Sequence, residues 1–177
     1  GIPMLDLKGI LPEEDIQKLI ALIVDRGGMV KNLHGQKNVY YQVNATYFSA
    51  LGESEQKLLL ARAIQIFMPG KPQIWYLDLF AGKNDHEAVQ RAGESGHKEI
   101  NRTNLSVDQI AEGLKKDVVQ KQLALIRMRN THKAFSEGAE VTISGEESSL
   151  EIRWEYDGAY AELHVNFEEG TYTIESN

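Results

Sequence analysis

The 177-residue sequence contains no cysteine, which excludes disulfide bonds, thiolate catalysis and cysteine-based zinc sites. It also lacks long apolar runs, because charged residues interrupt every hydrophobic stretch well before the ~20 residues that a membrane-spanning helix needs. Positive charge is scarce, because the chain has 19 basic and 26 acidic residues. The resulting formal net charge of −7 would repel a nucleic-acid backbone. The first six residues have neither the basic start nor the apolar stretch of a secretory signal. We therefore expect a cytoplasmic protein whose partners include neither nucleic acid nor membrane.

The composition that remains is that of an ordinary globular protein. Hydrophobic residues make up 42% of the chain and charged residues 25%, which is enough apolar material for a sizeable core. The length fits either one domain or a piece of a larger protein.

Two helices are predicted in the first part of the chain. Pro12, followed by three acidic residues, opens a helix with an apolar stripe, and Gly27-Gly28 ends it. Ser54 is placed to cap a second helix that runs to Phe67 and is stopped by Pro69-Gly70. Residues 29–47, between these helices, show no sustained period, and we expect an irregular excursion there.

A short strand and two further helices are predicted next. Residues 73–77 are rich in β-forming side chains and are bounded by Pro72 and Gly82, which indicates a buried strand. Residues 78–104 look loop-like. Ser106 and Gln109 then form a capping box, and a later helix spans about residues 118–131.

From Glu140 onward the apolar residues alternate with period two. Runs around 141–143, 150–154, 159–165 and 171–174 are separated by turn residues, and Asp157-Gly158 is a strong hairpin signal. These features predict an antiparallel meander that is too small for two layers of its own and should lean on the preceding helix.

Common catalytic motifs are absent. The five histidines are scattered, with no pair at helical spacing, so no metal site is expected. Gly82-Lys83-Asn84 is not a phosphate-binding loop, because Leu77 stands where that motif needs glycine and Asn84 where it needs serine or threonine. No cofactor is implied.

Glycoside chemistry needs two carboxylates about 5–9 Å apart. The loop regions offer five acidic residues, but nothing in their spacing pairs them, so we expect solvated surface acids: Asp78, Asp85, Glu87, Glu94 and Glu99. Arg102 differs because it lies in a loop that follows the predicted strand, where barrel enzymes build their active sites. It is a candidate for ligand contact, and a salt-bridged surface arginine is the alternative.

An aromatic and amide cluster lies in the irregular excursion. It consists of Tyr40-Tyr41-Gln42 and Tyr47. Aromatic faces stack on sugars and amides bond hydroxyl groups, so the cluster suits a carbohydrate site. Packing of the excursion onto the body of the protein explains it equally well.

Four short signatures, in one order, carry a resemblance to a known family. They are Phe67-Met68-Pro69-Gly70-Lys71-Pro72-Gln73-Ile74-Trp75-Tyr76, Ala81-Gly82-Lys83-Asn84-Asp85, Ile100-Asn101-Arg102 and Arg127-Met128-Arg129-Asn130-Thr131-His132-Lys133-Ala134-Phe135. Together they resemble the C-terminal third of the sucrose phosphorylase family, a branch of the α-amylase-like glycoside hydrolases. The likeness covers residues 1–135 and becomes loose in the β tail.

The resemblance implies an α/β fold, namely the C-terminal part of a (β/α)8 barrel followed by a small antiparallel β-sheet domain. Three segments are then expected. Residues 1–53 would form a barrel helix and an irregular insertion with the acceptor loop, residues 54–137 the last βα units of the barrel, and residues 138–177 the β domain.

The resemblance also implies a substrate site. Arg102 falls on the family's substrate-binding arginine, and Tyr41 and Gln42, preceded by Tyr40, fall on the Tyr-Gln of a mobile acceptor loop. Val39 departs from the pattern, because sucrose-specific members typically have an acidic residue there that holds fructose. The leaving sugar is therefore open, and glucosylglycerate, glucosylglycerol or sucrose 6-phosphate could replace sucrose.

The implied activity belongs to a parent protein. A retaining phosphorylase of this family transfers glucose from an α-glucoside to phosphate, with an aspartate nucleophile and a glutamate acid/base that would both lie upstream of Gly1. The implied partners are the α-glucoside, phosphate and the N-terminal part of the barrel; homo-oligomerisation is open. No residue of this chain would be catalytic, and the chain alone would be inactive. The alternatives are a non-catalytic carbohydrate-binding or protein-interaction module and, less well supported, an enzyme with a site around Asp85 and Arg102.

Overall fold

The computed structural model describes residues 2–32 and 40–177, apart from the side chains of residues 31, 32, 40, 41, 94 and 95. The chain groups into two compact units, each made from two separate segments. Unit 1 combines Gly1–Ser54 with Trp75–Ala111, and unit 2 combines Glu55–Ile74 with Glu112–Asn177. The three segments expected from the sequence, 1–53, 54–137 and 138–177, stay a prediction about the domain organisation.

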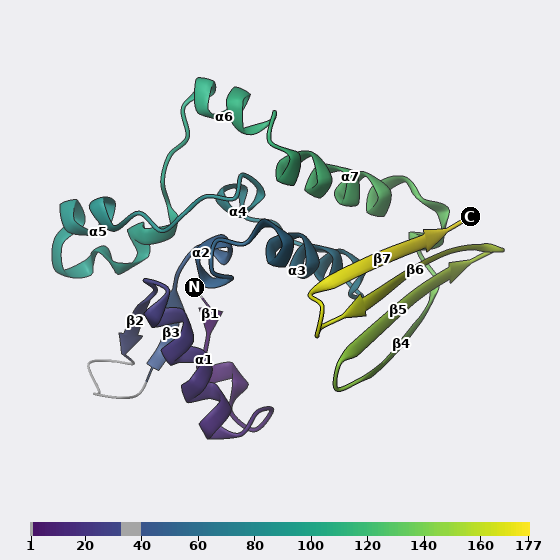
Figure 1. Cartoon of the computed structure of the whole chain (residues 1–177), viewed down its shortest axis with the longest axis horizontal. Helices are drawn as coiled ribbons and strands as arrows, with labels where there is room; N and C mark the ends of the chain where they lie inside the picture. The colour runs from purple at the N-terminus through teal and green to yellow at the C-terminus, as the bar shows by residue number, and fades with distance from the viewer. Residues whose placement is uncertain (1, 33–39) are drawn as a thin grey trace. The chain divides into compact units, whose positions relative to one another are not determined.

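Unit 1 is built on a small antiparallel sheet with a helix packed beside it. Its strands are β1 (Ile2–Pro3), β2 (Met29–Asn32) and β3 (Tyr40–Asn44), in the order β1-β3-β2, and the helix is α1 (Glu13–Asp25) (Figure 1). Ile16, Ile20 and Ile23 of α1 form a core with Val43 of β3. The expected irregular excursion over residues 29–47 is therefore wrong where β2 and β3 pair. These two strands are short, and a shift in register interrupts their pairing, so they give little period-two signal in the sequence.

Short helical turns make up the rest of unit 1. They are η1 (Leu5–Leu7), α2 (Tyr47–Ala50), α4 (Tyr76–Leu79), α5 (His86–Ala92), η3 (Gly93–Asn101) and α6 (Val107–Gly113), the last of which ends in unit 2. The capping box before α6 is confirmed, since the Ser106 N–H donates to Gln109 Oε1 at 2.8 Å and the Gln109 N–H to Ser106 Oγ at 3.2 Å. None of the described helices combines the length and the apolar character that crossing a bilayer requires.

The strand expected over residues 73–77 does not form. Trp75 has extended backbone angles, φ −71° and ψ 136°, but α4 begins at the next residue. Within the described residues no neighbouring strand pairs with this segment. Because a strand is stabilised by the ladder it joins, a β-rich sequence without a neighbour stays extended and unpaired.

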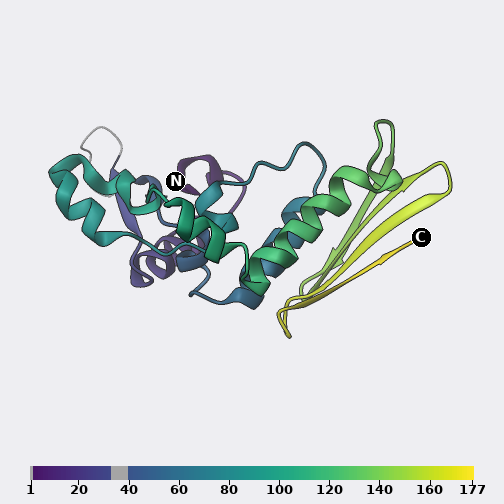
Figure 2. The same ribbon diagram turned by 90° about the horizontal axis from the view of Figure 1, so that it is seen from above.

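Unit 2 consists of two helices and a four-stranded sheet. The helices are α3 (Glu55–Phe67) and α7 (Asp117–Thr131), and the single turn η4 (Lys133–Phe135) leads into the sheet. The strands β4 (Glu140–Glu146), β5 (Ser149–Tyr156), β6 (Ala159–Asn166) and β7 (Thr171–Ser176) pair in chain order (Figure 2). The predicted meander is thus confirmed. Asp157 and Gly158 both have positive φ, 45° and 77°, as the predicted two-residue hairpin requires.

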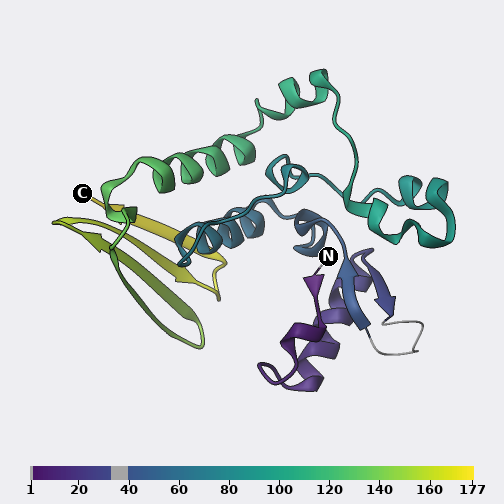
Figure 3. The ribbon, with the colours of Figure 1, turned by 180° about the vertical axis from the view of Figure 1, so that it is seen from behind.

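One face of this sheet is buried against the helices. Ile152, Trp154 and Leu163 on that face pack with Phe67 of α3 and Leu125 of α7. Figure 3 shows α3 and α7 side by side within the unit, and α3 contacts β5, β6 and β7 directly. The sheet was expected to lean on the preceding helix; it rests on α3 as well, which lies far earlier in the chain.

Candidate functional site

The expected acceptor-loop residues lie on and beside the β2-β3 hairpin. Tyr40, Tyr41 and Gln42 open β3. Val39 lies outside the described residues, as do the side chains of Tyr40 and Tyr41. The half-buried Gln42 side chain donates from Nε2 to Asn44 Oδ1 at 2.8 Å. Two amides from the same face of β3 are therefore linked, and the second one is almost fully buried.

Arg102 is exposed in the loop that follows η3. Its Nη1 lies 3.3 Å from Glu99 Oε1, and both side chains are more than 40% exposed. An exposed ion pair contributes at most about 1 kcal/mol, so the guanidinium can exchange this carboxylate for another oxygen ligand at small cost. The sequence alternatives, a ligand-binding arginine and a salt-bridged one, are thus compatible with each other.

Asn101 fixes the loop that carries Arg102. Its Nδ2 donates to the Ala45 carbonyl at 3.3 Å, directly beyond the end of β3, and its own carbonyl accepts the Trp75 Nε1–H at 3.0 Å. The segment η3 also contacts both β2 and β3. The structure therefore brings together the two parts of the chain that hold the sequence-predicted binding residues.

Asp85 braces the same loop on both sides of Arg102. Its N–H donates to the Ile100 carbonyl at 2.8 Å, and its Oδ2 accepts the Thr103 hydroxyl at 2.9 Å. Its Oδ1 accepts the Ala88 N–H at 2.8 Å, which caps α5. The hydrogen bonds from Ala88 and then from Thr103 hold the pKa of the Asp85 carboxyl below its ordinary value.

The substitution Asp85→Ala should loosen this loop. Losing the cap alone costs about 1–2 kcal/mol, whereas Asp85→Asn keeps an equivalent cap and should cost less. The carboxyl has a lowered pKa in the folded state, so its contribution is present above the unfolded-state pKa of about 3.9 and is lost as pH falls through the folded value. Amide hydrogen exchange at Ala88 and Arg102 measures this: we expect faster exchange in Asp85→Ala at pH 6, and parental rates there would contradict the assignment.

The chain between β3 and α2 is held by two further side chains that the sequence did not single out as structural. Asn84 Oδ1 accepts the Thr46 N–H at 2.8 Å, and Asp78 Oδ1 accepts the Tyr47 N–H at 2.9 Å. Asp78 is buried. Its carboxylate is therefore occupied with positioning Tyr47, the exposed aromatic residue of the predicted cluster.

The remaining loop acids are also engaged. Glu87 forms an ion pair with Arg91 at 3.6 Å within α5, and Glu99 pairs with Arg102. The side chain of Glu94 lies outside the described residues. Each described acid that the sequence offered in this loop region, namely Asp78, Asp85, Glu87 and Glu99, therefore has a hydrogen-bond or ion-pair partner.

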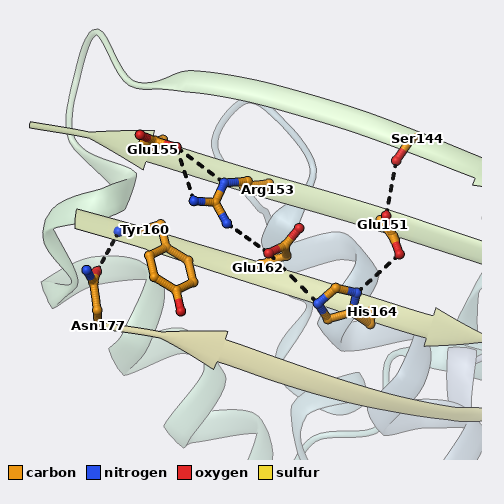
Figure 4. A network of polar contacts seen from close by, with 8 residues as sticks. All are labelled: Ser144, Glu151, Arg153, Glu155, Tyr160, Glu162, His164 and Asn177. Atoms are coloured by element: carbon orange, nitrogen blue, oxygen red, sulfur yellow. Dashed lines mark hydrogen bonds and ion pairs between the residues drawn. The ribbon is translucent and has the colours of Figure 1, made fainter. Parts of the chain in front are cut away.

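A cluster with metal-ligand side chains occurs elsewhere, on the outer face of the unit 2 sheet. Glu151, Glu162 and His164 place one ligand atom each within 4.8 Å of one another. Arg153 already reaches this group, with Nη1 2.9 Å from Glu162 Oε2, and His164 Nδ1 lies 3.4 Å from Glu151 Oε1 (Figure 4). The cluster is thus part of a cross-strand charge network, which accounts for its geometry.

The sequence did not predict that Asn101 and Asp85 support the loop that carries Arg102. Each acts through backbone groups far away in the chain, and such partners leave no periodic signal. A signal was nevertheless available, because both residues stand inside the short signatures that carry the family resemblance: Asn101 precedes Arg102, and Asp85 follows Asn84.

No family model matches the chain, but comparison with known proteins finds relatives that are all phosphorylases of glucosides. It is 50% identical over 183 residues to a sucrose 6(F)-phosphate phosphorylase of Ilumatobacter coccineus, a match that covers 98% of this chain and 35% of the relative. It is 35% identical to a sucrose phosphorylase of Streptococcus mutans, covering 100% of this chain and 38% of that protein. The chain thus spans little more than a third of the length of these relatives.

A solved structure agrees with these relatives. The crystal structure of sucrose 6F-phosphate phosphorylase from Thermoanaerobacter thermosaccharolyticum matches with a TM-score of 0.89 at 35% identity, covering 96% of this chain and 34% of that one. The mixed fold, with its antiparallel sheets, is therefore the fold of the corresponding part of that enzyme.

Proposed function

The chain is homologous to the C-terminal part of the sucrose phosphorylases, and we propose that it is the C-terminal part of a retaining glucosyl phosphorylase. The observation that carries this proposal is the 50% identity, over 98% of the chain, to a sucrose 6(F)-phosphate phosphorylase. The parent protein would act in the cytoplasm on an α-glucoside and phosphate, and would need no metal or organic cofactor.

In this proposal the N-terminal part of a (β/α)8 barrel covers surfaces that unit 1 leaves open. Trp75 has extended backbone angles, pairs with no described strand and is 50% exposed. Val107 is 81% exposed and Ile110 37%. An unpaired β segment and large exposed apolar side chains are costly in a finished protein, and both are expected where the last strand and helix of a barrel meet their missing neighbours.

The chemistry would come from carboxylates of the upstream part. An aspartate attacks the anomeric carbon while a glutamate donates a proton to the leaving sugar oxygen, which breaks the glycosidic bond. Phosphate then displaces the aspartate and leaves as α-glucose 1-phosphate with retained configuration. Arg102, with Gln42, Tyr40, Tyr41 and Val39, would orient the substrate. The isolated chain would be inactive.

For the leaving sugar we propose fructose 6-phosphate. The name of the relative from Ilumatobacter coccineus indicates a phosphorylated fructosyl group. A neutral residue at position 39 suits an anionic sugar, because an acidic side chain there would repel the phosphate.

A chimeric enzyme tests the proposed function. The matched C-terminal region of the Ilumatobacter coccineus relative is replaced with this chain, and release of α-glucose 1-phosphate from sucrose 6-phosphate and phosphate is measured. We expect activity from the chimera and none from the 177-residue chain alone. A chimera that folds but has no activity, or turnover by the chain alone, would contradict the proposal; the second outcome would favour a site around Asp85 and Arg102.

The substitution Val39→Asp, made in that chimera, tests the leaving sugar. We expect kcat/KM for sucrose 6-phosphate to fall by about tenfold, the effect of roughly 1.4 kcal/mol of charge repulsion, while kcat/KM for sucrose falls less or rises. Val39→Asn has a similar size without charge and serves as the control. Equal losses for the two substrates would sink the argument from charge.

A further inference from the structure

Unit 2 contains a pocket that shares no residue with the candidate substrate site of unit 1. It has a volume of about 530 Å³ and lies where the loop after α3, the end of α7 and β5 meet. Lys71, Arg129, Asn130 and Trp154 are among the residues that line it. Small-molecule sites typically occupy about 300–1,000 Å³, so the pocket is large enough to hold a small metabolite.

The structure holds Arg129 rigidly at this pocket. Its guanidinium carbon lies 4.1 Å from the ring centroid of Trp154 and 4.7 Å from that of Phe135. Its Nη2 donates to the Gly70 carbonyl at 2.9 Å. A guanidinium fixed by two rings and one hydrogen bond has already lost most of its side-chain freedom, so little more is lost when it binds a ligand.

Arg129 has no counter-ion within the part of the chain that the structure describes, in contrast to several other arginines. Arg91, Arg102 and Arg153 each lie within salt-bridge distance of a glutamate. Among the described residues no carboxylate pairs with Arg129, and its Nη1 is buried without a hydrogen-bond partner. Burial lowers the pKa of Arg129, which means that the surroundings disfavour its charge.

A second cation lies at the same pocket. Lys71 is exposed, and no described acidic residue forms an ion pair with it. The acidic lining residue Glu137 is likewise not within ion-pair distance of Lys71 or Arg129. Lys71, Arg129 and the Asn130 amide therefore offer hydrogen-bond donors to this pocket, and no described acidic residue pairs with either cation.

We propose that this pocket binds a small oxyanion ligand, whose phosphate or carboxylate group pairs with Arg129 and Lys71. The bidentate fork of an arginine matches either group, and the ring-lined floor keeps the fork in place. The residues all belong to unit 2, whereas the candidate substrate residues belong to unit 1. The inference therefore does not depend on the proposed function.

The two tryptophans of the chain make the test specific. The substitution Trp75→Phe leaves Trp154 as the remaining tryptophan, and its fluorescence then reports on the ring that stacks with Arg129. The intact chain carrying Trp75→Phe is titrated with inorganic phosphate and, separately, with acetate, at constant ionic strength set by chloride. We expect a saturable change in Trp154 emission, and whichever anion binds tighter identifies the group that the pocket selects.

Three further substitutions locate the binding. Arg129→Gln should weaken it by at least about tenfold, the loss of one charge-assisted hydrogen bond, and Lys71→Gln by about two- to fivefold, because that side chain is exposed. Lys133→Gln is the matched control, since it removes the same charge from the same unit but from a side chain that pairs with Asp157. Its affinity should be unchanged.

Folding of the variants is checked by circular dichroism, and Lys71→Gln keeps the test valid if Arg129→Gln does not fold. Saturation that weakens in Arg129→Gln or Lys71→Gln but not in Lys133→Gln supports the site. The absence of saturation with either anion, or equal weakening in Lys71→Gln and Lys133→Gln, would show that Arg129 serves only to pack the two rings.

Discussion

Replacing Arg102 with alanine should lower kcat/KM of the chimeric phosphorylase by about 100- to 1,000-fold. This is the usual cost of removing one charged donor that contacts the reacting substrate, about 2.7–4 kcal/mol. The structure favours such a role because the Arg102 side chain is exposed and tied only to Glu99, while its backbone is fixed by Asn101 and Asp85. A mobile charge on a fixed loop can meet a ligand without reorganising the fold.

A matched arginine separates this effect from a general loss of charge. Arg91 is also exposed, belongs to the same unit and pairs with a glutamate of its own helix. Arg91→Ala should leave kcat/KM within about twofold, as is usual for a surface substitution. Arg102→Lys should recover part of the loss, because it keeps the charge without the planar fork. If Arg102→Ala stays within threefold of the parent, the assignment of Arg102 to the substrate fails.

Replacing Trp154 with alanine should lower the free energy of unfolding of unit 2 by about 3–5 kcal/mol. Trp154 is only 7% exposed, and its ring centroid lies 5.4 Å from that of Phe135. Its Nε1–H donates to the Phe67 carbonyl at 2.6 Å, which joins the sheet to the end of α3. The substitution removes a large core side chain and leaves a buried carbonyl without its donor.

Two other substitutions make this prediction specific. Trp154→Phe keeps an aromatic ring but not the hydrogen bond, so we expect a smaller loss of about 1–3 kcal/mol. Tyr160→Ala lies on the opposite face of the sheet, where the ring covers Arg153, and should cost about 1 kcal/mol or less. Hydrogen exchange of the β5 and β6 amides measures the stability of unit 2 separately from unit 1. A loss below about 1 kcal/mol for Trp154→Ala would mean that this ring does not link the sheet to α3.

The parts of the fold that the sequence predicts are those with local causes. The helices α1, α3 and α7 and the unit 2 meander follow from proline and glycine near helix ends, periodic apolar positions and the Asp157-Gly158 turn. The expected strand over residues 73–77 was wrong because a strand depends on its neighbour, which no local pattern supplies. The β2-β3 hairpin was missed because its two short strands are too brief to establish a period.

The candidate site shows the same division. The exposed Arg102 could be singled out from its place in a loop and from the family resemblance. Asn101 and Asp85 reach the carbonyls of Ala45 and Ile100 and the hydroxyl of Thr103, and these contacts exist only once the chain has folded. The pocket at Arg129 combines the end of α7 with β5 and the loop after α3, so no stretch of sequence contains it.

The mass of the natural polypeptide that contains this sequence tests the central claim most directly. The chain has a mass of 19.9 kDa and spans 35% of its relative from Ilumatobacter coccineus. The account predicts a single polypeptide of roughly three times that mass, or a 19.9 kDa chain bound to a separate barrel subunit, that releases α-glucose 1-phosphate. A free 19.9 kDa polypeptide without such a partner would contradict the account and would leave a non-catalytic module.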